Sequence, residues 1–118
     1  MAVTLAQISA DTGEVYDAVD GGTTAVTSII GRAEEFVKSQ TGTTTGYDVI
    51  IRPLSDAMTV NHVMGGIDPV SKTIGTLSVG AKELRSMRNY FKQEANSAAI
   101  INGVSLDGLR IIMKDSAQ

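Results

Sequence analysis

The residues from Thr23 to Gly42, TTAVTSIIGRAEEFVKSQTG, decide the fold of this chain. Their apolar side chains recur at intervals of three and four residues, which is the period of one helix face. The members of this face are Val26, Ile29, Ile30, Ala33, Phe36 and Val37. Thr23 or Thr24 offers a side-chain cap for the first turn, and Gly42 stands where a left-handed glycine ends a helix. The stretch predicts a helix of about five turns that needs partners to cover its apolar face.

A second long helix is predicted over residues 47–64, with Thr45 and Asp48 forming a capped start. Its apolar positions are Val49, Ile50, Ile51, Leu54, Met58, Val60 and Val63. Pro53 has no backbone N–H, and its ring clashes with the preceding turn, which kinks a helix or splits it, here near Arg52. We expect one helix with a kink. The glycine pair that follows ends the helix.

Two further helices are expected, one at each end of the chain. Residues 81–102 form a clear amphipathic helix that Gly103 ends. Its predicted buried stripe consists of Leu84, Met87, Phe91, Ala95, Ala98 and Ile101. Near the N-terminus, Thr4 and Gln7 have the spacing of a capping box, which predicts a short helix that is interrupted near Gly13.

The remaining segments read as loop or strand. Residues 72–79 are rich in β-branched side chains and predict a short extended segment. Asp107-Gly108 is a strong hairpin signal between residues 104–106 and 109–113. An isolated hairpin is marginal in water, so residues 109–113 are expected to pair with residues 72–79 or with the sheet edge of another protein.

The predicted fold class is mainly α. We expect a small bundle of about four helices with a long middle loop and a short C-terminal β segment. The 118 residues form a single domain by length, with a helical body over about residues 4–103 and a β-like tail over residues 104–118.

Composition limits the classes of function. The formal charge is -3, which gives no strong field toward nucleic acid or an anionic membrane. The chain has no cysteine, so disulfides and thiolate chemistry are excluded. No basic segment followed by an apolar run occurs at the N-terminus, and no apolar stretch approaches the roughly 20 residues that span a bilayer. A soluble protein without a signal peptide or membrane segment is the expectation.

Chemistry-bearing residues are few. His62 is the only histidine, and its place near a helix end favours a capping or solvent-facing role over catalysis. Residues 75–82 lack the lysine that directly follows the second glycine of a phosphate loop. Arg85, Arg88 and Lys92 share one helix face and form a candidate ridge toward phosphates or a partner. We expect no catalytic residue, no metal site and no cofactor, and hence no enzyme.

Four segments together carry a family resemblance. They are AEEFV at residues 33–37, the Thr41-Gly42 stop, YDVIIRPL at residues 47–54, and GTLSVG at residues 75–80. Their order along residues 20–114 resembles the head–tail connector proteins of tailed bacteriophages, which are also called adaptor or head-completion proteins. Pro53 departs from the family pattern, because a proline there shortens or bends the second long helix.

The resemblance implies a structural virion protein rather than a catalyst. Such subunits form a homo-oligomeric ring, commonly a dodecamer, beneath the portal protein, and they extend the channel for double-stranded DNA without reading its sequence. The ring links the capsid to a stopper or tail-completion protein. The implied location is the virion neck at the head–tail interface, after assembly in the host cytoplasm and without a membrane.

The resemblance also implies which residues meet partners. The portal-binding tail is Leu109, Arg110, Ile111, Ile112, Met113 and Lys114. The middle loop, residues 65–80, is an inter-subunit or tail-facing element, in which the implied contact residues are Ile67, Asp68, Pro69, Val70, Lys72, Ile74 and Leu77. The ridge of Arg85, Arg88 and Lys92 is the candidate for the DNA channel or a partner.

Two alternatives stay open at this point. One is another neck or tail-completion virion protein with a similar plan. The other is a small helical DNA-binding or regulatory module that uses the basic ridge. Ring formation without DNA affinity favours the virion proteins, whereas a DNA affinity that falls steeply with salt favours the regulatory module.

Overall fold

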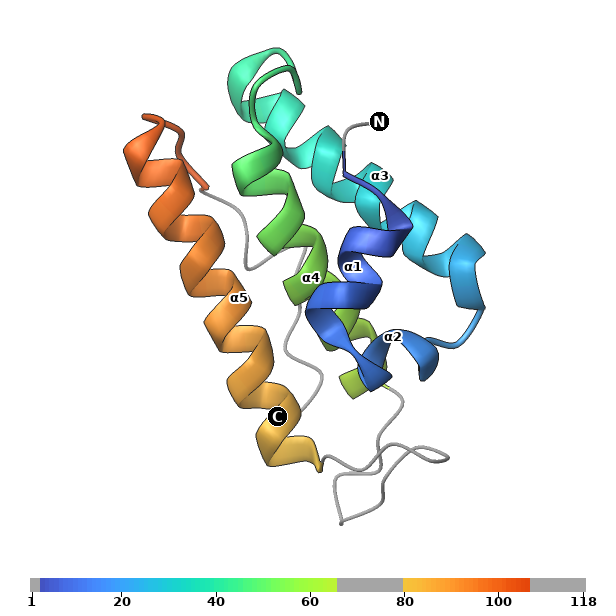
Figure 1. The fold of residues 1–118 in the computed structure, drawn as a ribbon. Coiled ribbons are helices and arrows are strands. Elements are labelled where there is room, and N and C mark those ends of the chain that lie inside the picture. Colours follow the sequence, from blue (N-terminus) through green and yellow to red (C-terminus); the bar gives the residue numbers. More distant parts are fainter. Residues whose placement is uncertain (1–2, 66–79, 107–118) are drawn as a thin grey trace.

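The structure is a computed structural model that describes residues 3–65 and 80–106. Within these ranges the chain forms five helices and no strand, which confirms the mainly α prediction. The helices are α1 (Leu5–Thr12), α2 (Glu14–Asp17), α3 (Gly22–Thr41), α4 (Asp48–Met64) and α5 (Ala81–Ile101). Helix α4 lies in the middle, with α5 antiparallel along one side and α1, α2 and α3 on the other (Figure 1).

The central position of α4 explains why its middle is buried on every side. Seven consecutive residues are buried there, namely Leu54, Ser55, Asp56, Ala57, Met58, Thr59 and Val60. A helix at the surface buries only one stripe, so such a run requires neighbours on both flanks. Polar residues are therefore carried into the core, and the Thr59 hydroxyl donates to the Ser55 carbonyl at 2.8 Å.

Helix α3 confirms the main sequence prediction. Val26, Ile29, Ile30, Ala33 and Val37 are buried, and Phe36 is half-buried against the same core. The predicted end of the helix at Gly42 is also confirmed. Gly42 has a left-handed φ of 87°, and its N–H donates to the Lys38 carbonyl at 2.7 Å. A side chain at this φ would be strained.

The predicted cap of α3 is wrong. The helix begins at Gly22, directly after the left-handed Gly21, and no side chain caps it. Thr23 and Thr24 therefore lie inside the first turn, where a residue cannot serve as the N-cap. Two glycines with positive φ turn the chain into the helix before the threonines are reached.

Helix α4 runs unbroken through Pro53, which confirms the prediction of one helix and excludes the alternative of a split near Arg52. The proline is the sixth residue of the helix, and only one hydrogen bond, to the carbonyl four residues earlier, is lost there. The predicted capped start is also wrong, since the N-cap is Tyr47 and no side chain bonds the first turn. The helix ends at Gly65, as expected.

Helix α5 occupies its predicted span, but its buried stripe is different. The buried residues are Leu84, Arg88, Phe91, Ala95 and Ala99, whereas Met87 and Ala98 are half-buried. Ile101 was expected in the stripe and is 83% exposed. From Leu84 onward, the buried positions follow one another at intervals of four, three, four and four residues. This spacing includes Arg88 in the contact stripe and leaves Ile101 outside it.

Both ends of the chain show further predicted features. Thr4 and Gln7 form the expected capping box, and Gly13, with a φ of 60°, separates α1 from α2. Gly103 ends α5 with its N–H bonded to the Ile100 carbonyl at 3.2 Å, while the next N–H reaches the Ala99 carbonyl at 2.8 Å. This pair of bonds is a Schellman motif.

The β predictions fall mostly outside the described residues. Residues 72–79 and 109–113 lie there, and residues 104–106, which are described, form no strand. Val104 and Leu106 instead pack, half-buried, against the core. In the parts of the chain that the structure describes, no helix is long and apolar enough to cross a bilayer.

Candidate functional site

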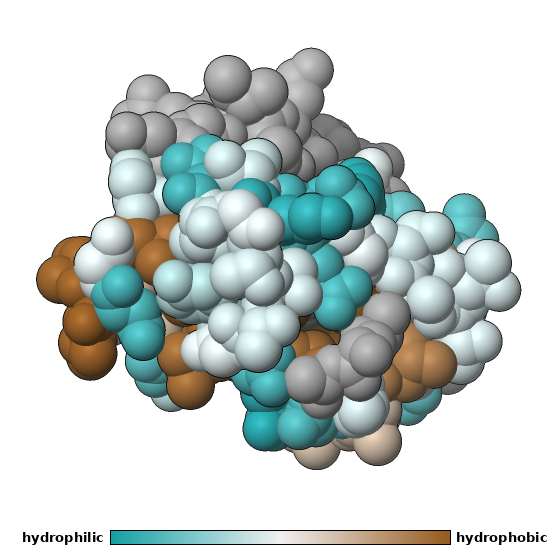
Figure 2. Space-filling view, turned by 90° about the horizontal axis from the view of Figure 1, so that it is seen from above, coloured by the Kyte–Doolittle hydropathy of each residue, from teal (hydrophilic) through white to brown (hydrophobic). Residues whose placement is uncertain are grey.

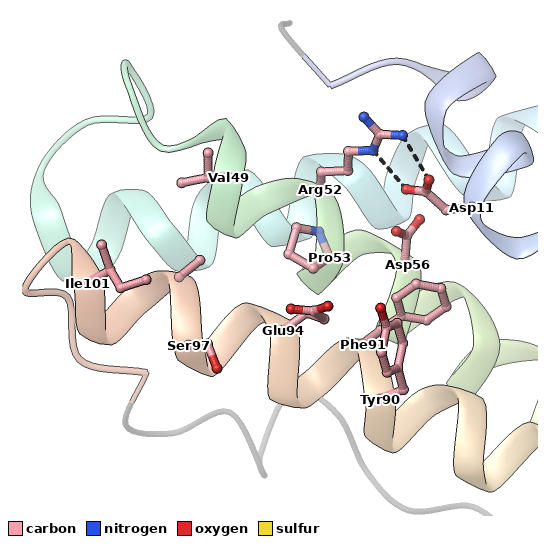
Figure 3. Close-up of a pocket in the computed structure, with 11 residues that line it drawn as sticks. Asp11, Val49, Arg52, Pro53, Asp56, Tyr90, Phe91, Glu94, Ser97 and Ile101 are labelled. Carbon is pink, nitrogen blue, oxygen red and sulfur yellow. Dashed lines mark hydrogen bonds and ion pairs between the residues drawn. The ribbon is translucent and has the colours of Figure 1, made fainter.

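A pocket of about 360 Å³ opens where α4 and α5 meet the end of α1 (Figure 3). Its lining combines charged, aromatic and aliphatic side chains. The residues are Asp11, Val49, Arg52, Pro53, Asp56, Tyr90, Phe91, Glu94, Ser97, Ala98 and Ile101. A volume in this range suits a small ligand or a single inserted side chain.

Arg52 and Asp11 form an ion pair at one edge of the pocket. The Arg52 Nε and Nη2 atoms donate to the two carboxylate oxygens of Asp11, each at 2.8 Å (Figure 3). This two-pronged geometry is the strongest that a guanidinium makes with a carboxylate. The hydrogen bond from Arg52 lowers the pKa of Asp11, so this carboxyl group is ionised throughout the physiological range.

Asp56 lies one helical turn after Arg52 and is 2% exposed. Its Oδ1 atom is buried and has no hydrogen-bond partner among the described residues. Burial raises the pKa of Asp56 to about 9, and a hydrogen bond to Asp11 and the charge of Asp11 add to this effect, whereas the charge of Arg52 opposes it. At neutral pH Asp56 is therefore a carboxylic acid that donates its proton to the Asp11 carboxylate.

Helix α5 supplies the opposite wall. Tyr90 and Phe91 meet edge to face, with ring centroids 5.4 Å apart and an interplanar angle of 66°. One turn later, the Glu94 carboxylate accepts a hydrogen bond from the Tyr90 hydroxyl, and this hydrogen bond raises the pKa of Tyr90. The wall thus presents an aromatic surface and a carboxylate side by side (Figure 3).

The charges of the pocket do not balance. Among the described residues that line the pocket, Arg52 is the only cation, and its two donors shown in Figure 3 are directed to Asp11. Glu94 is a further carboxylate, and Asp56 is an acid whose buried Oδ1 atom accepts no hydrogen bond from the part of the chain that the structure describes. The arrangement is therefore suited to receiving positive charge and hydrogen-bond donors. Within residues 3–65 and 80–106, no three His, Cys, Asp or Glu side chains come together as a metal site would need.

Most of the residues that the sequence proposed as sites cannot be placed. The tail residues 109–114 and the loop residues 67–77 lie outside the described residues. His62 is exposed in the last turn of α4, as expected.

The basic ridge requires a correction. Arg85 is exposed and Lys92 is half-buried, but Arg88 is only 5% exposed. The Arg88 guanidinium donates to the side-chain Oδ1 atom of Asn89 at 3.0 Å and to that of Asn61 at 3.4 Å. It lies in the buried stripe of α5, so the three cations do not form one exposed face and Arg88 is not available to phosphates.

Sequence reasoning missed the pocket residues. One signal was present, because Arg52 and Asp56 are four residues apart and must share a helix face. A second was the aspartate within the apolar run Leu54 to Met58. No local pattern could have found the Asp11 partner, which lies 41 residues away along the chain.

Comparisons of this chain with models of protein families, with curated proteins and with solved structures gave no match.

Proposed function

We propose that this chain is a structural subunit that assembles with copies of itself as a head–tail connector in the neck of a tailed bacteriophage. The family resemblance of the sequence supports the virion role. The observation that carries the assembly role is a group of exposed large apolar side chains on α4 and α5. Exposure reaches 57% at Val49 and Tyr90, 78% at Ile100 and 83% at Ile101.

These side chains belong to one region of the surface. Val49, Tyr90 and Ile101 line the same pocket, and Ile100 precedes Ile101 in the last turn of α5. Hydrophobic side chains also reach the surface between polar ones in the view from above (Figure 2). Burying one isoleucine side chain contributes about 1.5 to 3 kcal/mol, so a partner that covers this region gains stability.

The partner we propose for this surface is a second copy. The pocket region is acidic, and the opposite flank of the molecule, α3, exposes the cations Arg32 and Lys38 together with the carboxylate of Glu35. Because α3 and α5 lie on opposite sides of α4, contact between them joins unlike surfaces of two copies (Figure 1). Such head-to-tail contacts form a ring when the rotation between successive copies closes, and the proposed assembly requires that closure.

The wider proposal follows the resemblance. The ring, commonly a dodecamer, lies beneath the portal and extends the channel for double-stranded DNA toward a stopper or tail-completion protein. The tail residues 109–114 bind the portal, and residues 65–80 face neighbouring subunits or the tail. Arg85 and Lys92 are the remaining cations of the ridge for the channel or a partner.

The test is the mass of the protein in solution, alone and with candidate portal proteins, by native mass spectrometry. We expect a ring, or a monomer that closes into one on the portal. Replacing Ile100 and Ile101 together with serine removes apolar surface that is exposed in the subunit, so the fold stays intact while assembly weakens. Gln93→Ser, at an exposed polar site of the same helix, is the control and leaves assembly unchanged.

A clear result would contradict this proposal. A protein that stays monomeric with every portal, and that binds duplex DNA with an affinity falling steeply as salt rises, is a DNA-binding module instead.

A further inference from the structure

We propose that the pocket between α4 and α5 binds an alkylammonium or alkylguanidinium group, with the cation at Asp56 and Glu94 and the aliphatic stem along the apolar wall. The chemistry is shared by a basic side chain of another chain and by a free amine. That the cation comes from a neighbouring copy rests on the proposed function. That the pocket binds such a cation does not.

The first argument is the unpartnered oxygen of Asp56. Asp56 is a residue of the pocket lining and is 2% exposed, and its buried Oδ1 atom accepts no hydrogen bond from the described residues. A buried acceptor without a donor costs free energy, and a ligand that supplies an N–H recovers it. The ligand must therefore carry a donor.

The second argument is charge. The charged and titratable groups around the pocket are Asp11 from α1, Arg52 and Asp56 from α4, and Tyr90 and Glu94 from α5. Asp11 and Arg52 neutralise each other in their ion pair. Glu94 and the acid Asp56 remain, so a donor with a positive charge is preferred over a neutral one.

The third argument is the shape and polarity of the walls. Val49, Pro53, Ala98 and Ile101 form an aliphatic surface beside the acidic groups (Figure 3). A short methylene chain packs there as the stem of a lysine or arginine does elsewhere. The Tyr90 ring adds a face that attracts a cation. These walls favour an organic cation over a hydrated metal ion.

Binding must release a proton. A cation beside Asp56 favours the ionised form of this carboxyl group, so a fraction of a proton leaves the protein when the ligand enters at neutral pH. This linkage is a signature that a merely apolar ligand does not produce.

The probes are n-butylammonium and n-butylguanidinium. Their binding to the full chain is measured by backbone NMR and by calorimetry in two buffers of different ionisation enthalpy. The matched controls are n-butanol, which has the stem without the charge, and butyrate, which has the opposite charge. We expect the cations to shift resonances of α4 and α5 around the pocket, to release protons, and to bind at least tenfold more tightly than n-butanol, as a charge-assisted hydrogen bond implies.

Variants connect the binding to the proposed residues. Asp56→Asn is isosteric with the protonated acid and preserves the fold, and Glu94→Gln removes the second carboxylate. Each should weaken n-butylammonium binding at least tenfold, and Asp56→Asn should also abolish the proton release. Glu35→Gln, at an exposed site on α3, is the control and leaves both unchanged. Equal binding of n-butanol, or binding that survives both pocket variants, overturns the proposal.

A separate experiment distinguishes the sources of the cation. If a neighbouring copy inserts a basic side chain, excess n-butylammonium lowers the mass of the assembly, and so does replacing Arg32 and Lys38 with glutamine. If the assembly is unaffected while the amine binds, the ligand is a free amine. If the chain never assembles, the proposed function fails while the amine-binding result still decides the pocket.

Discussion

Asp56 stays protonated at neutral pH because burial disfavours its charged form and the Asp11 carboxylate accepts its proton. Its pKa rises from 3.8 when the chain is unfolded to about 9 in the folded protein. Between these values the folded state holds one more proton than the unfolded state. The stabilising contribution is therefore complete below the unfolded pKa and is lost as the pH rises toward the folded pKa.

This linkage gives a prediction for stability. From pH 6 to pH 8.5 the free energy of unfolding should fall as the pH rises. Asp56 alone contributes up to about 1.4 kcal/mol to this fall for each pH unit. Asp56→Asn keeps the shape and can donate an N–H to Asp11, but it cannot titrate, so its profile should be flatter. Urea unfolding followed by circular dichroism measures the slope.

The control for this prediction is Asp20→Asn, at an exposed turn between α2 and α3, which should retain the slope of the natural chain. Parallel profiles for Asp56→Asn and the natural chain would show that Asp56 is not held as an acid.

At the scale of the elements, α3 contains two glycines that should respond in opposite ways to alanine. Gly42 has a φ of 87°, so Gly42→Ala is strained and should lower the free energy of unfolding by about 1 kcal/mol. Gly31 lies inside the helix, and a Cβ placed there meets no atom within 4 Å. Gly31→Ala should therefore raise the free energy of unfolding by about 0.5 to 1 kcal/mol.

Thermal unfolding of the two variants under one condition decides this point. Changes of the same sign would mean that the end of α3 at Gly42 is not left-handed or that Gly31 is not within a regular helix.

The apolar face of α3 provides a second prediction. Ile30 is fully buried in the core, and Ile30→Asp places an unpaired carboxylate there, which should unfold the protein. The matched control is Ser28→Asp, two residues earlier on the exposed side of the same helix, which should leave the far-ultraviolet circular dichroism unchanged. A folded Ile30→Asp protein would show that another face of α3 is buried.

At the scale of the whole molecule, the tail separates folding from assembly. Deleting residues 109–118 should leave the helical body folded, because the five helices and the segments next to them form a buried core within the described residues. The same deletion should abolish capture by the portal protein. Pull-down with the portal measures capture, and circular dichroism checks the fold. Unchanged capture would remove the tail from the portal interface.

The helical architecture was predictable because its signals are local. The apolar period of residues 23–42 determined α3 and its buried face, and the positions of Gly42 and Gly103 determined where two helices end. Thr4 and Gln7 likewise carry the information for their capping box within four residues. Backbone hydrogen bonds and side-chain spacing act over one or two turns, so the sequence is sufficient for them.

The predictions about burial that failed depend on packing between elements. Whether Arg88 or Ile101 is buried depends on which stripe of α5 contacts α4. The helical period alone allows this contact stripe to shift by about one residue. The acid at Asp56 is held by a partner 45 residues earlier and by burial from both flanks of α4. Burial and charge pairing are properties of the space between helices. The sequence by itself thus determined the helices and the glycines that end α3 and α5, and only the tertiary structure decided which polar groups the pocket brings together.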